Sequence, residues 1–113
     1  MVNPNLPETK LLKALLQPLL EDFQYWFERS VNLLENEEIL FLGAQQQSDL
    51  LGRVKQAQQE VRAAQALFQA TGGQVGVETA VLILWHKLLT ECWQVTIHFR
   101  LERFAKPGKN SES

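Results

Sequence analysis

The fold is decided by a stretch near the C-terminus, VETAVLILWHKLLTECWQVTIHFRLERF, which occupies residues 77–104. Its apolar residues recur at spacings of three and four, which is the period of an α-helix and not the alternation of a strand. Because neighbouring residues of a helix lie about 100° apart, these apolar side chains form two strips. The first strip is predicted to face inward and comprises Val77, Val81, Leu84, Trp85, Leu88, Cys92, Val95 and Phe99. The second strip lies about 120° away and comprises Leu82, Leu89, Trp93 and Ile97.

A helix that is apolar over this much of its circumference must contact two neighbours, or one neighbour and an external partner. We therefore predict that the second strip binds a partner protein or a second copy of the chain. Its predicted contact residues are Leu82, His86, Leu89, Trp93 and Ile97. Trp93 is the predicted anchor, because tryptophan is over-represented among residues that dominate binding energy.

Two further helices are predicted upstream, over residues 8–35 and 49–71. The stretch quoted above is then the third helix, over residues 77–104. Pro18 lies inside the first, where it predicts a kink or a helix start. The inward stripe of the first helix is Leu12, Leu15, Leu16, Leu19, Phe23, Trp26, Phe27, Ser30, Leu33 and Leu34. Ser48 and Asp49 are the predicted caps of the second helix.

The predicted fold is all-α, an antiparallel three-helix bundle running up, down and up, within a single domain of residues 1–105. Residues 106–113 are predicted to be a disordered tail. The inward stripe of the second helix is narrow, so we expect this helix to be the weakly held one. The alternative is a hairpin of the first and third helices, with the second swung out into a helical dimer.

Composition excludes several classes of protein. The chain has 13 acidic and 11 basic residues, a formal charge of −2, and lacks the cationic field that non-specific nucleic-acid binding needs. Cys92 is the single cysteine, and residues 1–6 lack the order of a secretory signal, so we expect a cytoplasmic protein. The most apolar window, residues 81–97, carries too many polar residues for a membrane-spanning segment.

No catalytic, cofactor or metal site is predicted. The chain lacks the Glu-x-x-His pairs of di-iron bundles, and its glycines lack the residues of a phosphate-binding loop. Cys92 lies on the inward strip and is interpreted as a small core residue. We expect a non-enzymatic protein; the alternative is an enzyme or small-ligand binder with a pocket between the first and third helices, lined by Asp22, Tyr25, Arg29, His86 and Glu91.

Asp22, Tyr25 and Arg29 lie on one side of the first helix, flanking its inward face. The first interpretation of this group is a structural bridge to a neighbouring helix, and the second is a polar recognition site. At the other end of the chain, the basic residues Arg100, Arg103, Lys106 and Lys109 accompany the apolar residues Phe99, Leu101 and Phe104. A further alternative is therefore weak contact of this basic end with an anionic membrane surface.

Four segments resemble a small cyanobacterial family of uncharacterised helical-domain proteins. They are LLEDFQYWF (19–27), RVKQAQQEV (53–61), GQVGVETAV (73–81), and the pair Trp85-His86 followed by ECW (91–93). The similarity covers Leu11 to Arg100. It implies a short soluble protein of a photosynthetic bacterium and brings no activity, cofactor or catalytic residue. Together with the residues above, it predicts an interaction, assembly or regulatory protein.

Overall fold

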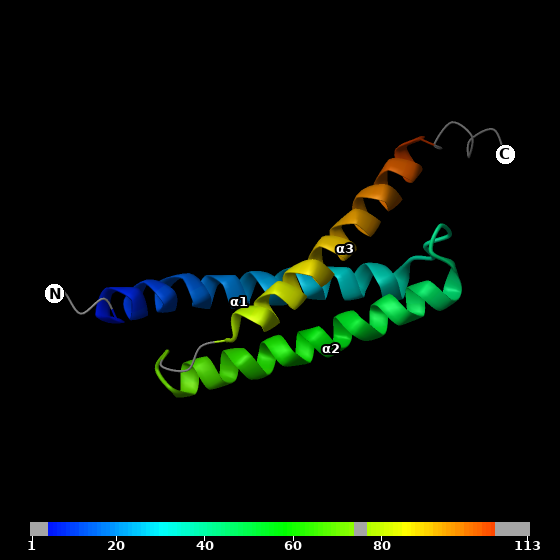
Figure 1. Ribbon diagram of the computed structural model, residues 1–113. Coiled ribbons are helices and arrows are strands. Elements are labelled where there is room, and N and C mark those ends of the chain that lie inside the picture. Colours follow the sequence, from blue (N-terminus) through cyan, green and yellow to red (C-terminus); the bar gives the residue numbers. More distant parts are fainter. Residues whose placement is uncertain (1–4, 74–76, 106–113) are drawn as a thin grey trace.

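The computed structural model describes residues 5–73 and 77–105, with side chains described over 14–73 and 77–104. These residues contain no strand and form three helices: α1 (Asn5–Asn36), α2 (Gly43–Ala70) and α3 (Thr79–Ala105). α1 and α2 run antiparallel as a hairpin, and α3 lies across it (Figure 1). The predicted all-α bundle of three helices is confirmed. The predicted tail, residues 106–113, lies outside the described residues.

The core forms where all three helices meet. Phe27 of α1 is completely enclosed, and Phe23 stacks on it with ring centroids 5.8 Å apart. Phe23 also makes an edge contact with Trp85 of α3, at 5.5 Å. α2 buries Leu50, Val54, Ala57, Val61 and Phe68, whereas α3 buries Trp85, Leu89, Cys92 and Val95. Each large apolar side chain buried in this way contributes roughly 1.5–3 kcal/mol.

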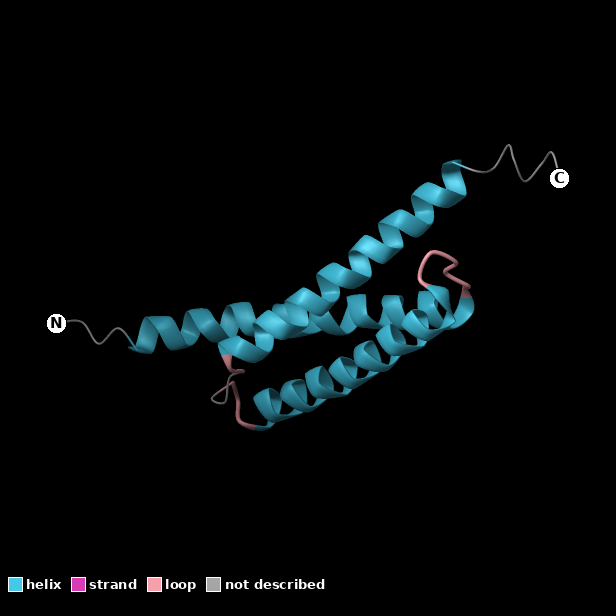
Figure 2. Cartoon of the chain, turned by 45° about the vertical axis from the view of Figure 1, so that its right-hand side comes forward, coloured by secondary structure: helices cyan, strands magenta, loops and turns pink. Residues whose placement is uncertain are grey.

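α3, and not α2, is the helix with the thinner packing. α1 packs along α2 for most of the hairpin and makes far fewer contacts with α3. The C-terminal half of α3 diverges from α2 in the view of Figure 1 and again in the turned view of Figure 2. The prediction of a weakly held second helix is therefore wrong, as is the alternative hairpin of the first and third helices. The narrow stripe of α2 is sufficient because it faces one neighbour along its whole length.

The helix boundaries lie within three residues of the predicted ones, except at the start of α2. α2 begins at Gly43, before the predicted caps Ser48 and Asp49. It starts there because the backbone N–H groups of Leu42 and Gly43 both donate to the carbonyl of the buried Ile39, closing a turn. Gly43 has a φ of +77°, a conformation that glycine adopts without strain. α1 continues through Pro18, so the predicted helix start there is also wrong.

The predicted inward strips are correct at the centre of the molecule and wrong at their edges. In α3, Leu84 was expected to face inward but is 64% exposed, whereas Leu89 was expected on the outer strip but is 5% exposed. In α1, Leu15 and Trp26 were expected in the core and are exposed, whereas Leu20 is buried. The cause is the oblique crossing of α3, which covers a different arc of each helix from that of a parallel bundle.

The fold predicts that stability depends on Phe27. Phe27→Ala should lower the free energy of unfolding by about 3–5 kcal/mol, because it removes a fully enclosed ring at the centre of the core. Leu40→Ala, which changes an exposed side chain, is the control and should stay within about 0.5 kcal/mol of the wild type. Urea unfolding followed by circular dichroism measures both. Equal losses in the two variants would contradict this description of the core.

Candidate functional site: an exposed aromatic surface between α1 and α3

Three side chains of α1 form the first half of an exposed cluster. Arg29 lies one turn after Tyr25 and donates from Nη1 to the Tyr25 hydroxyl at 3.2 Å. Its guanidinium also lies over the rings of Tyr25 and Trp26, 5.6 and 5.7 Å from their centroids. The two rings meet edge to face, with centroids 5.0 Å apart. This arrangement holds three large side chains in place at the protein surface.

α3 supplies the second half. Trp93 packs edge to face on Trp26, with ring centroids 5.7 Å apart and an interplanar angle of 90°. Trp93 is still 39% exposed, and Ile97, one turn later on the same side of α3, is 58% exposed. We call Tyr25, Trp26, Arg29, Trp93 and Ile97 the aromatic surface. Leu101 and Phe104 continue it along the diverging end of α3, where Phe104 is 79% exposed.

The composition of the aromatic surface is that of a binding surface. Tryptophan, tyrosine and arginine are the residues most enriched among those that dominate protein–protein affinity. Rigid aromatic rings also lose little conformational entropy on binding. The surface has no charged side chain other than Arg29. Its exposed side chains are therefore mainly aromatic and aliphatic, with the Arg29 guanidinium at one edge.

The structure places some of the five predicted contact residues at the surface and others in or against the core. Trp93 and Ile97 lie on the aromatic surface, and His86 is exposed on the same side of α3. Leu82 is half-buried against the core, and Leu89 is buried within it. The prediction that Leu89 lies on an open strip is therefore wrong, because Leu89 borders the buried face of α3 and is covered where α3 crosses α1.

The five residues of the alternative ligand pocket are not brought together. Tyr25 and Arg29 contact each other, and Asp22 is exposed one turn before Trp26. Glu91, however, faces α2, where both of its oxygens accept from Arg53, at 3.1 and 2.8 Å. The hydrogen bonds from Arg53 hold the pKa of Glu91 below its usual value, against the opposing effect of partial burial. Glu91 is a link between helices.

A second link between α2 and α3 satisfies a buried donor. The indole Nε1 of Trp85 donates to Oε1 of Glu60 at 3.0 Å. Trp85 is buried, and an unpaired indole N–H there would be costly. These two polar links join α2 to α3, alongside the apolar contact of Trp85 with Phe23 of α1.

Cys92 is a core residue, as predicted. Its side chain is buried beside the half-buried Thr96, the next position on the same face of α3. Burial raises the pKa of the Cys92 thiol, and a hydrogen bond with Ser30 opposes that shift. A buried thiol with a raised pKa is a weak nucleophile. Within the described residues, no group of three or more His, Cys, Asp or Glu side chains could hold a metal ion.

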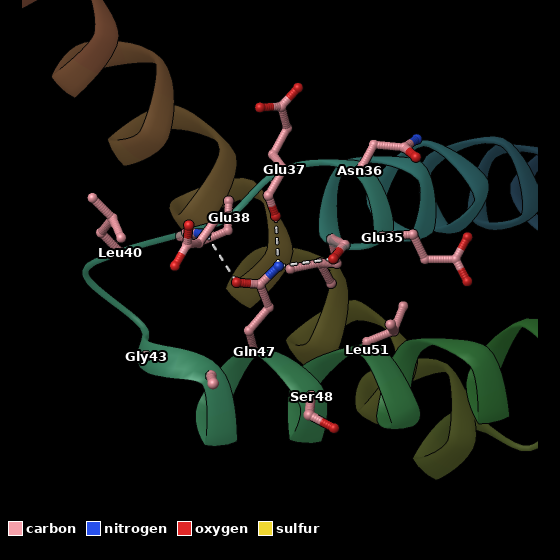
Figure 3. A pocket seen from close by; sticks show the side chains of 12 residues that line it. Glu35, Asn36, Glu37, Glu38, Leu40, Gly43, Gln47, Ser48 and Leu51 are labelled. Atoms are coloured by element: carbon pink, nitrogen blue, oxygen red, sulfur yellow. Dashed lines mark hydrogen bonds between the residues drawn. The ribbon is translucent and has the colours of Figure 1, made fainter.

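Sequence reasoning missed Gln47, whose amide holds the α1–α2 connection together. Nε2 donates to the carbonyls of Leu34 and Glu37 at 2.8 and 2.7 Å, and Oε1 accepts from the backbone N–H of Ile39 at 2.9 Å. Figure 3 shows the amide reaching between the end of α1 and the following loop. Its position within three consecutive glutamines hid this role, because nothing local distinguishes it from its neighbours.

In the surface hollow beside Gln47, of about 490 Å³, the Gln47 amide is already hydrogen-bonded to the backbone of the α1–α2 connection. The carboxylates of Glu35 and Glu37 point away from the Gln47 amide in different directions (Figure 3). A second hollow, of about 430 Å³, lies between α2 and α3 and is lined by Gly52, Arg53 and Leu84 among others. Neither hollow includes a residue of the aromatic surface. Of the described helices, none is long and apolar enough to cross a membrane.

Residues 6–101 match the family described as protein of unknown function DUF2605. The match covers most of the chain, so the chain belongs to this family, and the predicted membership of an uncharacterised family is confirmed. No curated protein matches the chain, and no solved structure matches it. Function must therefore be inferred from the chain's own surface.

Gln47→Leu should destabilise the hairpin. The substitution removes three hydrogen bonds and leaves backbone groups at the end of α1 without that partner, at a cost of about 2 kcal/mol in unfolding free energy. Gln46→Leu, at the exposed neighbouring position, is the matched control and should change stability by less than about 0.5 kcal/mol. Thermal unfolding of the two variants would contradict this role of Gln47 if their midpoints were the same.

Glu91→Gln should cost less than about 1 kcal/mol at neutral pH, because the Arg53 pair is nearly half exposed and screened by solvent. The folded-state pKa of Glu91 lies below the ordinary 4.5, so the pair contributes fully above that pH and is lost as the pH falls through the lower folded value. The stability difference between wild type and variant should therefore shrink in acid. Urea titrations at several pH values measure it, and a difference that grew in acid would refute the assignment.

Proposed function

We propose that this member of the DUF2605 family is a non-enzymatic interaction protein that binds a macromolecular partner through the aromatic surface. The main support for the proposal is the Trp26–Trp93 pair. The two rings pack edge to face on each other, and both remain exposed to solvent. An assembly or regulatory role follows from binding of this kind. The origin in a photosynthetic bacterium stays a prediction.

The distribution of apolar residues on α3 supports the proposal. Side chains that face the hairpin are buried, but Ile83, Leu84, Ile97 and Leu101 on the other sides of the helix are exposed. A helix that is apolar over more than one face is normally covered by more than one neighbour. Isolated exposed leucines are ordinary, whereas a contiguous aromatic and aliphatic surface marks an interaction site.

A membrane surface is the second candidate. Leu101 and Phe104 are among the most exposed large apolar side chains, and Arg100 lies between them and Ile97 on α3. Apolar side chains beside arginine suit the boundary between lipid headgroups and acyl chains. The aromatic surface itself lies mainly on α1 and the middle of α3, which favours a protein partner over lipid.

Ile97→Glu and Trp93→Ala should each weaken partner binding at least tenfold, because they place a charge in the contact or remove its anchor. Both positions are exposed, so the helical circular dichroism should remain close to that of the wild type. Leu67→Glu, on the exposed side of α2, is the control. Sedimentation velocity and capture of partners from the native lysate measure the effect. If Ile97→Glu behaved like Leu67→Glu in both assays, the proposal would be wrong.

A further inference from the structure

We infer that the partner of the aromatic surface is a second copy of this chain, bound antiparallel about a two-fold axis that passes close to Trp26. The inference rests on the proposed function, since it names the partner of the same surface. It is argued from the charges that flank Trp26 on α1.

Asp22 and Arg29 lie seven residues apart on α1. Seven residues are two helical turns, so the two side chains share one edge of α1, about 10 Å apart along its axis. Trp26 lies between them and slightly to one side, on the aromatic surface. Both Asp22 and Arg29 are exposed. Along this edge of α1, an acidic side chain is therefore followed by an aromatic and then a basic one, so that opposite charges lie at its two ends.

These two charges are not neutralised within the protomer. Among the described residues, Asp22 takes part in no hydrogen bond or ion pair. Within the same part of the chain, Arg29 forms no ion pair; it hydrogen-bonds to the Tyr25 hydroxyl and lies over the rings of Tyr25 and Trp26. Other charges on this protein do find partners, as Lys55 does with Glu35 across α1 and α2. The edge beside Trp26 is thus left ready for an external ion pair.

An antiparallel second copy supplies that ion pair twice. Reversing α1 about an axis near Trp26 brings Asp22 opposite Arg29 of the partner subunit, and Arg29 opposite Asp22 of the partner subunit. This reciprocity is the condition for a two-fold interface, in which the same patch on each copy complements itself. A parallel pairing of the two α1 helices would instead bring like charges together, which is unfavourable.

The same reversal covers the apolar part of the surface. Trp93 touches Trp26, so it also lies near the axis and approaches Trp93 of the partner subunit. Leu19, which is exposed two turns before Trp26, comes opposite the half-buried Leu33 of the partner subunit. A stable interface needs about 800 Å² from each partner. The exposed side chains of both α1 and α3 contribute to this interface, which is therefore larger than the outer strip of α3 alone.

Charge reversal tests the inference. The wild type should be a dimer at tens of micromolar in low salt, and Asp22→Arg and Arg29→Asp should each be monomeric, because each variant faces itself with like charges. An equimolar mixture of the two variants should form a heterodimer, since every acid then meets a base. Glu28→Arg makes the same charge change on another face of α1 and should stay dimeric. Light scattering after gel filtration gives the masses, and native mass spectrometry identifies the heterodimer.

A monomeric wild type would overturn the inference, as would single variants that remain dimeric or a mixture that stays monomeric. None of these results would by itself remove the proposed function. If the wild type is monomeric but Ile97→Glu abolishes capture of another protein, the surface binds a different protein. If Ile97→Glu instead abolishes flotation with phosphatidylglycerol vesicles, the surface binds membrane. If Ile97→Glu changes nothing, both the inference and the proposed function fail.

Discussion

The whole arrangement depends on the burial of two phenylalanines on one side of α1. Phe27 fills the space between the helices, and Phe23 joins it to Trp85 of α3. Because these rings lie one turn apart on the same side of α1, they can be covered only if α2 and α3 approach from that side. Both helices do so, and the remaining side of α1, with Tyr25 and Trp26, is left facing solvent.

The candidate site exists because α3 packs obliquely on the α1–α2 hairpin. A helix that crosses the hairpin buries side chains only near the crossing, which for α3 means Trp85 to Val95. Beyond it Phe99 is still partly buried, but Ile97, Leu101 and Phe104 are exposed. The edge of the crossing is where Trp93 meets Trp26, so the aromatic surface is a direct result of the crossing geometry. Two polar links, from Arg53 and Glu60 of α2, also join α3 to the hairpin near the crossing.

The candidate site could be predicted in part. The outer strip of α3 correctly placed Trp93 and Ile97 among the exposed side chains, at 39% and 58% exposure. Leu89 was incorrectly predicted to be exposed. It lies only about 40° around the helix from the buried Trp85, and the way α3 crosses α1 decides which side chains at the border of the buried face are covered. Trp26 was assigned to the core for the same reason. Gln47 could not be found, because its partners are backbone groups 8 to 13 residues away.

By itself the sequence determined that this chain forms three long helices, with a third helix too apolar for one neighbour to cover. These properties follow from local periodicity, which any helix of this composition must obey. Only the tertiary structure decided that α3 is the thinly packed helix, that Trp26 faces outward to meet Trp93, and that Glu91 and Glu60 link α3 to α2. Those outcomes depend on the angle between the helix axes and on the position along each helix at which they cross. The crossing is set by the shapes of all the contacting side chains together, and no single stretch of sequence contains it.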